Sequence, residues 1–336
     1  MFRSRVVTVM VCALLTLGAC GQSEDPDEPA EEAEAPSSVT LRTGPNDPED
    51  PNIAVTEFLP EKVVVKTGTE VTWEYAGPEP HSVTFFPEGQ TPPPPGADPS
   101  LSEGNEATGP VDGATFINSG LRPAGPDAPE PFKLTFDKAG TFNYVCVIHP
   151  LMTGQVTVTD DEAEADSQAE ITRRGDDELE QWLEEGRAAK QKLVSAPAKS
   201  ATEGNATVWS VEMGATTEHT DVLAFHPVSA AIKPGDRVVF VNNSGAPHTA
   251  TFAGGAELPQ NPESDEAKAA APGPSPQTLT MTRLFNTGWL PPNAPPGAAP
   301  PEAARSYTYV VPESGDYTYV CLLHAPSGMV GTIKVA

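Results

Sequence analysis

The chain has 336 residues, which is enough for two ordinary domains that each bury their own core. Its 38 prolines and 28 glycines argue against long helices and favour short strands joined by turns and irregular loops. The formal net charge of -27 argues against nucleic acid as a partner and favours solubility or a cationic partner, although it carries no information about the fold.

The first 19 residues have the composition of a signal peptide. Two early arginines precede an apolar run over residues 6–19, which is too short to span a bilayer comfortably. The run ends in Leu17-Gly-Ala-Cys20, which resembles the bacterial lipobox and implies lipid attachment at Cys20 after cleavage before it. Ordinary signal cleavage, with Cys20 left free, is the alternative. Lipidation would give an exported protein anchored to the outside of the cell membrane, or to the periplasmic or outer-membrane face, without a transmembrane helix in the mature chain.

Residues 20–38 form an acidic, proline-containing tether. After Cys20 they carry no apolar side chain beyond alanine and proline, so they cannot bury a core. We expect this stretch to be solvated and to lift the first domain off a membrane surface.

The rest of the chain contains a tandem repeat. Residues 58–85 match residues 225–252 without a gap, at an offset that also relates two histidines near their ends (248 − 81 = 167). The later segments Tyr144-Val-Cys146 and Tyr319-Val-Cys321 match at a slightly larger offset (321 − 146 = 175). Because both halves keep the same motifs in the same order, the sequence predicts two copies of one domain.

Each repeat has the pattern of several short strands. Lys-x-Gly at residues 66–68 and 233–235 is followed by alternating apolar residues, which is typical of a turn and a strand. Such strands, with turns rich in glycine and proline, predict an all-β fold of Greek-key sandwiches. We expect one sandwich over residues 39–159 and the other over residues 204–336. Their proline-rich stretches, 91–99 and 291–301, are expected to be extended surface loops.

A charged linker over residues 160–203 joins the repeats. Ser167 and Glu170 have the spacing of a capping box. A partial apolar stripe of helical period follows, formed by Leu179, Trp182 and Leu183. Gly175 and Gly186 are expected to break this stripe. The linker is therefore predicted to be partly helical, with one or two helices packed on a domain. A partner-binding helix is the alternative.

Two short loops bring sulfur and nitrogen donors together. The first reads Cys146-x2-His149-x2-Met152, and the second reads Cys321-x2-His324-x4-Met329. A thiolate, an imidazole and a thioether form a soft ligand set that suits copper, with methionine as a weak axial ligand. A disulfide between the two cysteines is the alternative, but the repeated His and Met favour a ligand role.

A blue copper site also needs a second histidine from elsewhere in the fold. His81 and His248 meet this requirement, since each follows a proline and precedes a short strand pattern ending in Thr-Phe. With these residues, both repeats resemble the cupredoxins, in which the first histidine lies in a loop before a strand and the other ligands lie on a C-terminal loop. The loop of the first repeat resembles that of amicyanin, and the loop of the other repeat resembles those of plastocyanin and pseudoazurin.

The resemblance implies two type 1 copper ions that cycle between Cu(I) and Cu(II). Each repeat would supply one ligand set: His81, Cys146, His149 and Met152 in the first, and His248, Cys321, His324 and Met329 in the second. It also implies that Ser82 and Thr249 donate their backbone N–H groups to the cysteine sulfurs. The exposed ring edges of His149 and His324 would be the exit for electrons. Core packing is the alternative for each methionine, and loss of metal is the alternative for either repeat, although neither has lost a ligand.

One-electron transfer between redox proteins is the function that this resemblance implies. Two-domain cupredoxins also include nitrite reductases and laccases, whose further copper needs His-x-His pairs and a histidine beside the cysteine. The chain has no His-x-His, and apolar residues flank Cys146 and Cys321. His219 and His226 remain outside the ligand sets and are expected at the surface, too few for another copper site. We therefore expect a carrier and not an enzyme.

Copper binding for delivery or buffering at the cell surface is the remaining alternative function. For a carrier, the acidic composition predicts basic redox partners whose docking weakens as the salt concentration rises.

Overall fold

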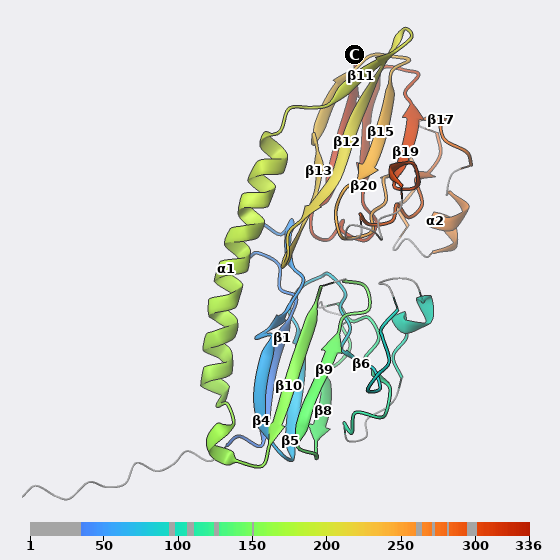
Figure 1. Ribbon diagram of the computed structural model, residues 1–336. Coiled ribbons are helices and arrows are strands. Elements are labelled where there is room, and N and C mark those ends of the chain that lie inside the picture. The colour runs from blue at the N-terminus through green and yellow to red at the C-terminus, as the bar shows by residue number, and fades with distance from the viewer. Residues whose placement is uncertain are drawn as a thin grey trace, which may run out of the picture. The chain divides into compact units, whose positions relative to one another are not determined.

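The computed structural model describes residues 35–93, 98–105, 111–123, 128–149, 151–259, 264–270, 273–280, 282–293 and 301–336. These residues form two β-sandwiches joined by one long helix, so the predicted all-β class is confirmed (Figure 1). The signal peptide, the lipidation site at Cys20, most of the tether and parts of both proline-rich stretches lie outside the described residues. The domain boundaries given above stay a prediction.

The first sandwich packs a four-stranded sheet against a five-stranded sheet. The first sheet has the order β3-β1-β5-β8, with β3 at Phe58–Leu59, β1 at Ser38–Thr43, β5 at Thr69–Tyr75 and β8 at Phe132–Phe136. The second has the order β4-β10-β9-β6-β7, with β4 at Lys62–Lys66, β10 at Thr153–Thr159, β9 at Gly140–Val145, β6 at Thr84–Phe85 and β7 at Ile117–Asn118. Alternate residues of β1, β4 and β10 are buried, as a period of two requires for a sheet with one inner face.

The second sandwich repeats this plan. One sheet runs β17-β19-β15-β12-β13, with β17 at Gln277–Thr278, β19 at Ser306–Val310, β15 at Arg237–Asn242, β12 at Ala206–Thr216 and β13 at Thr220–His226. The other runs β14-β21-β20-β16-β18, with β14 at Ser229–Ile232, β21 at Val330–Val335, β20 at Gly315–Val320, β16 at Thr251–Phe252 and β18 at Phe285–Asn286. β11 (Ser200–Glu203) pairs with β12, and a short helix α2 spans Asp265–Ala269.

Matching aromatic residues fill the two cores. In the first sandwich, the Trp73 and Tyr144 rings meet edge to face with centroids 5.3 Å apart. In the second, Phe240 and Tyr319 meet in the same way at 4.9 Å. The sequence offsets that relate these pairs, 167 and 175, are those of the repeat. The duplication seen in the sequence is therefore also a duplication of the core.

One short strand of the first repeat belongs to the second sandwich. β2 (Ile53–Val55) pairs antiparallel with β13, so that Val55 lies opposite Thr220. Just beyond it, the Thr56 N–H donates to the His219 carbonyl at 2.9 Å. Backbone hydrogen bonds thus tie the two sandwiches together along a sheet edge that would otherwise be open.

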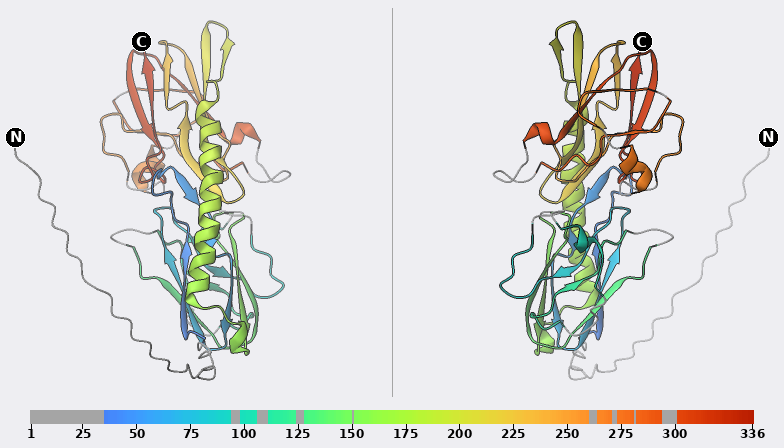
Figure 2. Two further views of the ribbon diagram at one scale, coloured as in Figure 1. Left: turned by 90° about the vertical axis from the view of Figure 1, so that its left-hand side faces the viewer. Right: turned by 90° about the vertical axis from the view of Figure 1, so that its right-hand side faces the viewer.

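The linker contains one continuous helix, α1 (Gln168–Ser195), which begins with the predicted capping box. Ser167 accepts from the Glu170 N–H, and Glu170 accepts from the Ser167 N–H. The expectation that Gly175 and Gly186 break the helix is wrong, because both lie buried within it. Figure 2 shows α1 running alongside both sandwiches.

The two helix glycines are explained by close packing. A Cβ atom at Gly186 would lie 2.5 Å from Cγ2 of Ile53, and one at Gly175 would lie 3.1 Å from the Leu59 carbonyl carbon. Glycine lets the helix backbone approach β2 and β3 at the cost of weaker helix propensity. Trp182 and Leu183 of the same helix then cover the apolar side chains of β2. Among the described residues, no helix is long and apolar enough to cross a bilayer.

Candidate metal centres

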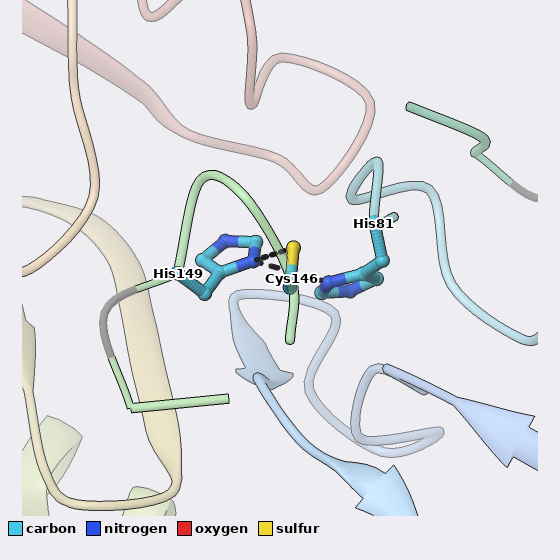
Figure 3. Close-up of side chains that lie close together, drawn as sticks. All are labelled: His81, Cys146 and His149. Carbon is cyan, nitrogen blue, oxygen red and sulfur yellow. Dashed lines mark hydrogen bonds between the residues drawn. The ribbon is translucent and has the colours of Figure 1, made fainter. Parts of the chain in front are cut away.

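The first centre is assembled from two loops at one end of the first sandwich. His81 lies between β5 and β6, where its backbone exchanges two hydrogen bonds with Arg122, at 3.2 and 2.9 Å. Cys146 follows β9, and His149 lies in the loop that leads to β10. Figure 3 shows the three side chains converging, with the His149 ring next to the cysteine sulfur. The pairing of strands far apart in sequence therefore brings His81 to the cysteine loop.

The donor atoms of the first centre face one another in a buried space. Nδ1 of His149 lies 3.1 Å from Nδ1 of His81 and 3.3 Å from Sγ of Cys146. All three side chains are buried. Met152 is buried in the same core, and its carbonyl accepts from the Cys146 N–H at 3.0 Å. That hydrogen bond closes the loop between β9 and β10 and keeps its ends close together.

The second centre has nearly the same dimensions. Nδ1 of His324 lies 3.0 Å from Nδ1 of His248 and 3.4 Å from Sγ of Cys321. The Cys321 sulfur lies 3.7 Å from His248 Nδ1. The Met329 carbonyl accepts from the Cys321 N–H at 3.1 Å, and the Met329 side chain is buried. The second loop has two more residues between His and Met than the first, yet the same backbone hydrogen bond between Cys and Met closes it.

Both cysteine sulfurs accept the predicted backbone hydrogen bond. The Ser82 N–H points at Cys146 Sγ across 3.4 Å, and the Thr249 N–H points at Cys321 Sγ across 3.5 Å. Each donor follows the first histidine directly, so this prediction is confirmed. A donor to the sulfur favours the thiolate form and tunes a metal held there.

The electrostatics of each centre favour a thiolate beside positive charge. Burial would raise the pKa of the Cys146 thiol, but the His149 imidazole holds it well below its ordinary value. Burial would lower the pKa of His149, yet the Cys146 thiolate and the Glu79 carboxylate raise it to about 10. Cys321 and His324 shift in the same directions for the same reasons. A bound metal cation would supply this positive charge.

Glu79 is a residue of the centres that the sequence motifs did not indicate. Its carboxylate is 2% exposed and lies between the two centres. Oε2 is 3.0 Å from Nε2 of His324, and Oε1 is 3.5 Å from Nε2 of His149. Burial would raise the pKa of Glu79, but these two imidazoles hold it well below its ordinary value. The repeat alignment could have drawn attention to it, because Ala246 occupies the matching position (246 − 167 = 79).

The expectation of exposed ring edges at His149 and His324 is wrong. Their exposed fractions are 3% and 0%, and the Nε2 edge of each ring faces Glu79 instead of solvent. The physical reason is that the two sandwiches cover each other's ligand loops. Asn52 of the first repeat, for example, donates from Nδ2 to the Ser327 carbonyl of the second ligand loop at 2.6 Å.

The expectation that His219 and His226 lie at the surface is also wrong. His226 is buried, and its Nε2 lies 2.8 Å from the Ala196 carbonyl after α1. His219 is half-buried, stacks on Trp182 with ring centroids 4.9 Å apart, and pairs through Nδ1 with Glu57 at 3.0 Å. Both histidines join elements of the fold, and neither is part of the two groups of potential metal ligands found among the described residues.

The donor sets suit copper. In each set, a cysteine sulfur and the Nδ1 atoms of two histidines lie together, at the separations of 3.7 Å or less given above. A buried methionine lies in the same loop as the cysteine. Two imidazoles with one thiolate and a weak thioether are the ligands of blue copper sites. Fold and sites together define a cupredoxin, here with two sandwiches in one chain.

Comparison with known proteins agrees with this class. Residues 50–159 match the family described as copper binding proteins, plastocyanin/azurin family. The plastocyanin of Nostoc punctiforme is 30% identical over 145 residues, which cover 43% of this chain and 84% of that protein. That of Scenedesmus fuscus is 31% identical over 126 residues, covering 38% and 97%. The chain therefore belongs to the plastocyanin/azurin family of copper-binding proteins.

Solved structures of amicyanin are also similar to this chain. A copper(I) form of an amicyanin variant is 20% identical, with a TM-score of 0.24, and the match covers 38% of this chain and 87% of that one.

Proposed function

We propose that the protein is an electron carrier with two type 1 copper ions, one in each sandwich. The ligands would be His81, Cys146, His149 and Met152 in the first centre, and His248, Cys321, His324 and Met329 in the second. The observation that carries this proposal is the presence of two sets of buried donors with nearly equal distances, each made of one sulfur and two Nδ1 atoms.

The residues of each centre are arranged to keep a metal's ligands fixed during a change of charge. Copper in such a set cycles between Cu(I) and Cu(II) and so carries one electron. The two histidines of each centre come from two different loops that backbone hydrogen bonds hold in place, the cysteine sulfur accepts a backbone N–H, and burial excludes water. Rigid, dry ligands reduce the reorganisation that accompanies electron transfer.

A carrier is favoured over an enzyme by the surroundings of the two sets. Apolar residues flank both cysteines, and all three donors of each set are already directed at a common centre. Among the described residues, the two remaining histidines hold carbonyl or carboxylate partners. An enzyme would need an open coordination position for its substrate.

We further propose that lipid on Cys20 anchors the protein outside the cell membrane. The support is the sequence Leu17-Gly-Ala-Cys20 after an apolar run, followed by an acidic stretch that cannot bury a core. The partners are proposed to be redox proteins with basic docking surfaces, because the chain carries a net charge of -27.

The decisive experiment measures copper content and the visible spectrum of the full chain and of two variants. We expect two copper ions and an intense blue thiolate-to-copper band. Cys146→Ser and Cys321→Ser should each remove one copper and about half of the blue absorbance, because only the thiolate gives that band.

Unchanged blue absorbance in either variant would contradict the presence of two copper sites. A redox cycle provides the second part of the test: a carrier retains both ions as Cu(I) and Cu(II), whereas rapid loss of copper on reduction would indicate delivery or buffering instead.

A further inference from the structure

A single buried carboxylate connects the ligand shells of the two metal centres. Glu79 precedes the ligand His81 by two residues and so belongs to the first sandwich. Its closest contact, however, is with the second sandwich, where Oε2 lies 3.0 Å and Oε1 lies 3.2 Å from His324 Nε2. On the other side, Oε1 lies 3.5 Å from His149 Nε2. Nε2 of His149 has no hydrogen-bond partner within the part of the chain that the structure describes.

The ring nitrogens show how this contact bears on the centres. In both histidines Nδ1 faces the cysteine sulfur and Nε2 points at Glu79. With Nδ1 bound to a metal, Nε2 would carry the ring proton. A carboxylate that accepts from the second nitrogen of a metal-binding histidine fixes the tautomer and orientation of the ring. Here one carboxylate faces two such rings, one from each centre.

The arrangement is specific to the contact between the repeats. The second repeat carries Ala246 where the first carries Glu79, and Ala246 is fully buried. One carboxylate is therefore present where duplication could have produced two. The loop that holds His324 is also held by the first sandwich, since Asn52 donates to the Ser327 carbonyl at 2.6 Å.

We propose that Glu79 bridges the two centres and that one electron passes between them along the path His149, Glu79, His324. This inference rests on the proposed function. With copper held at both centres and one of the two ions reduced, the Cu(I) centre would give up one electron and the Cu(II) centre would accept it, with His149, Glu79 and His324 supplying the path. No bond is made or broken and no proton leaves the bridge. The ring edges of His149 and His324, which the family resemblance predicted to be the exposed exit for electrons, both face Glu79 here.

The test compares Glu79→Gln and Glu79→Ala with the unaltered chain, each loaded with copper at both centres. Glutamine keeps the size of the side chain but can accept from only one ring while its amide N–H₂ meets the other; alanine removes the bridge. Glu74→Gln, an exposed carboxylate on β5, is the matched control. A pulse of less than one reducing equivalent produces half-reduced molecules, and the blue band of each centre is followed, assigned from the two cysteine variants.

The unaltered chain should show a redistribution of the electron whose rate does not depend on protein concentration. Glu79→Ala should slow it by about tenfold or more, the lower end of the loss on removing a carboxylate partner of a metal-binding histidine. Glu79→Gln should slow it with copper and colour retained, and Glu74→Gln should leave it unchanged. The absence of this phase in the unaltered chain, or an equal rate in Glu79→Ala, would overturn the proposal.

A further measurement does not depend on loaded copper. NMR of the metal-free protein should show a slowly exchanging Nε2–H proton on His324, which Glu79 contacts at 3.2 Å, and Glu79→Ala should abolish this protection. Equal protection in that variant would overturn the bridge. Failure of the proposed function is distinguishable from both results, because it would appear as absence of copper and of the blue band in the unaltered chain.

Discussion

At the scale of single residues, the two centres have the same types of donor but differ in the contacts of their first histidine. Nε2 of His248 is hydrogen-bonded to the Ser244 hydroxyl group at 2.7 Å. Gly77 occupies the matching position in the first repeat (244 − 167 = 77), and His81 Nε2 has no hydrogen-bond partner among the described residues. Because such a partner fixes the ring and raises its basicity, the second centre is expected to hold its metal more tightly.

Removal of the Ser244 hydroxyl should weaken the second centre alone. In a Cys146→Ser background, where only that centre keeps its thiolate, Ser244→Ala should lower copper affinity by about 10- to 100-fold. A copper titration followed through the blue band measures this change. Ser229→Ala, an exposed serine on β14, is the control and should have no effect. Equal affinity in the Ser244 variant would show that the hydroxyl does not position the ring.

At the scale of elements, α1 acts as a brace along both sandwiches. Its glycines bring the backbone close to β2 and β3, and its charged residues are paired with the loop before β2. Arg187 forms a two-point contact with Asp47, and Lys190 contacts Asp50 at 2.6 Å. A helix of this length with few apolar residues depends on such contacts more than on its own propensity.

Gly186→Ala should destabilise the protein, although the same change in an exposed helix is stabilising. The added methyl group would lie 2.5 Å from Ile53 Cγ2, so β2 must shift. Overpacking of this kind costs about 1–3 kcal/mol and exceeds the gain in propensity of roughly 0.5–1 kcal/mol. Denaturant unfolding measures the difference. Ala188→Gly on the exposed face of the same helix is the control and reports the effect of helix propensity alone. A Gly186→Ala variant that is more stable than the unaltered chain would contradict close packing at this position.

The Arg187–Asp47 contact should make the stability of the brace depend on pH. Arg187 holds the pKa of Asp47 below its ordinary value of 3.8. When the pKa of a carboxyl group is lower in the folded state than in the unfolded state, its contribution to stability is complete above the unfolded-state pKa. That contribution is lost as the pH falls through the folded-state pKa. Asp47→Asn should therefore lower the urea midpoint at pH 7, and its difference from the unaltered chain should close below pH 3.8.

The control for this pH dependence lies on the same helix. Asp177 pairs with Arg173 in an exposed contact one turn apart, with both side chains about two-thirds in solvent. Asp177→Asn should change the midpoint little at any pH, because exposed pairs contribute little. A difference for Asp47→Asn that stays constant from pH 7 to pH 3 would show that its charge is not the source of the stabilisation.

At the scale of the whole molecule, the two sandwiches behave as one structural unit whose membrane attachment is proposed to depend on the tether. Cys20→Ala should move the protein from the membrane fraction to the soluble fraction, since it removes the site of lipid attachment. Cell fractionation with an antibody measures the distribution. Cys12→Ala is the matched control, because Cys12 lies in the segment expected to be removed. Membrane retention of the Cys20 variant would rule out lipid at that position as the anchor.

Much of the site could be predicted because its chemistry is local in sequence. Cys146, His149 and Met152 lie within seven consecutive residues, and the structure brings Cys146 and His149 together as expected. The repeat then supplied His81 and His248 by their constant offset. The direction of the Ser82 and Thr249 N–H groups followed from the family resemblance, because the same fold directs the same backbone groups at the sulfur.

The sequence by itself determined the all-β class, the duplication and the residue types at both centres, because strand patterns and loop motifs depend on neighbouring residues. Only the tertiary structure decided what surrounds them. β2 crosses to the second sandwich, Gly175 and Gly186 stay inside one helix, and His149 and His324 turn their edges to Glu79. Each of these features depends on two surfaces of distant segments meeting, and no local pattern records which surface will cover another.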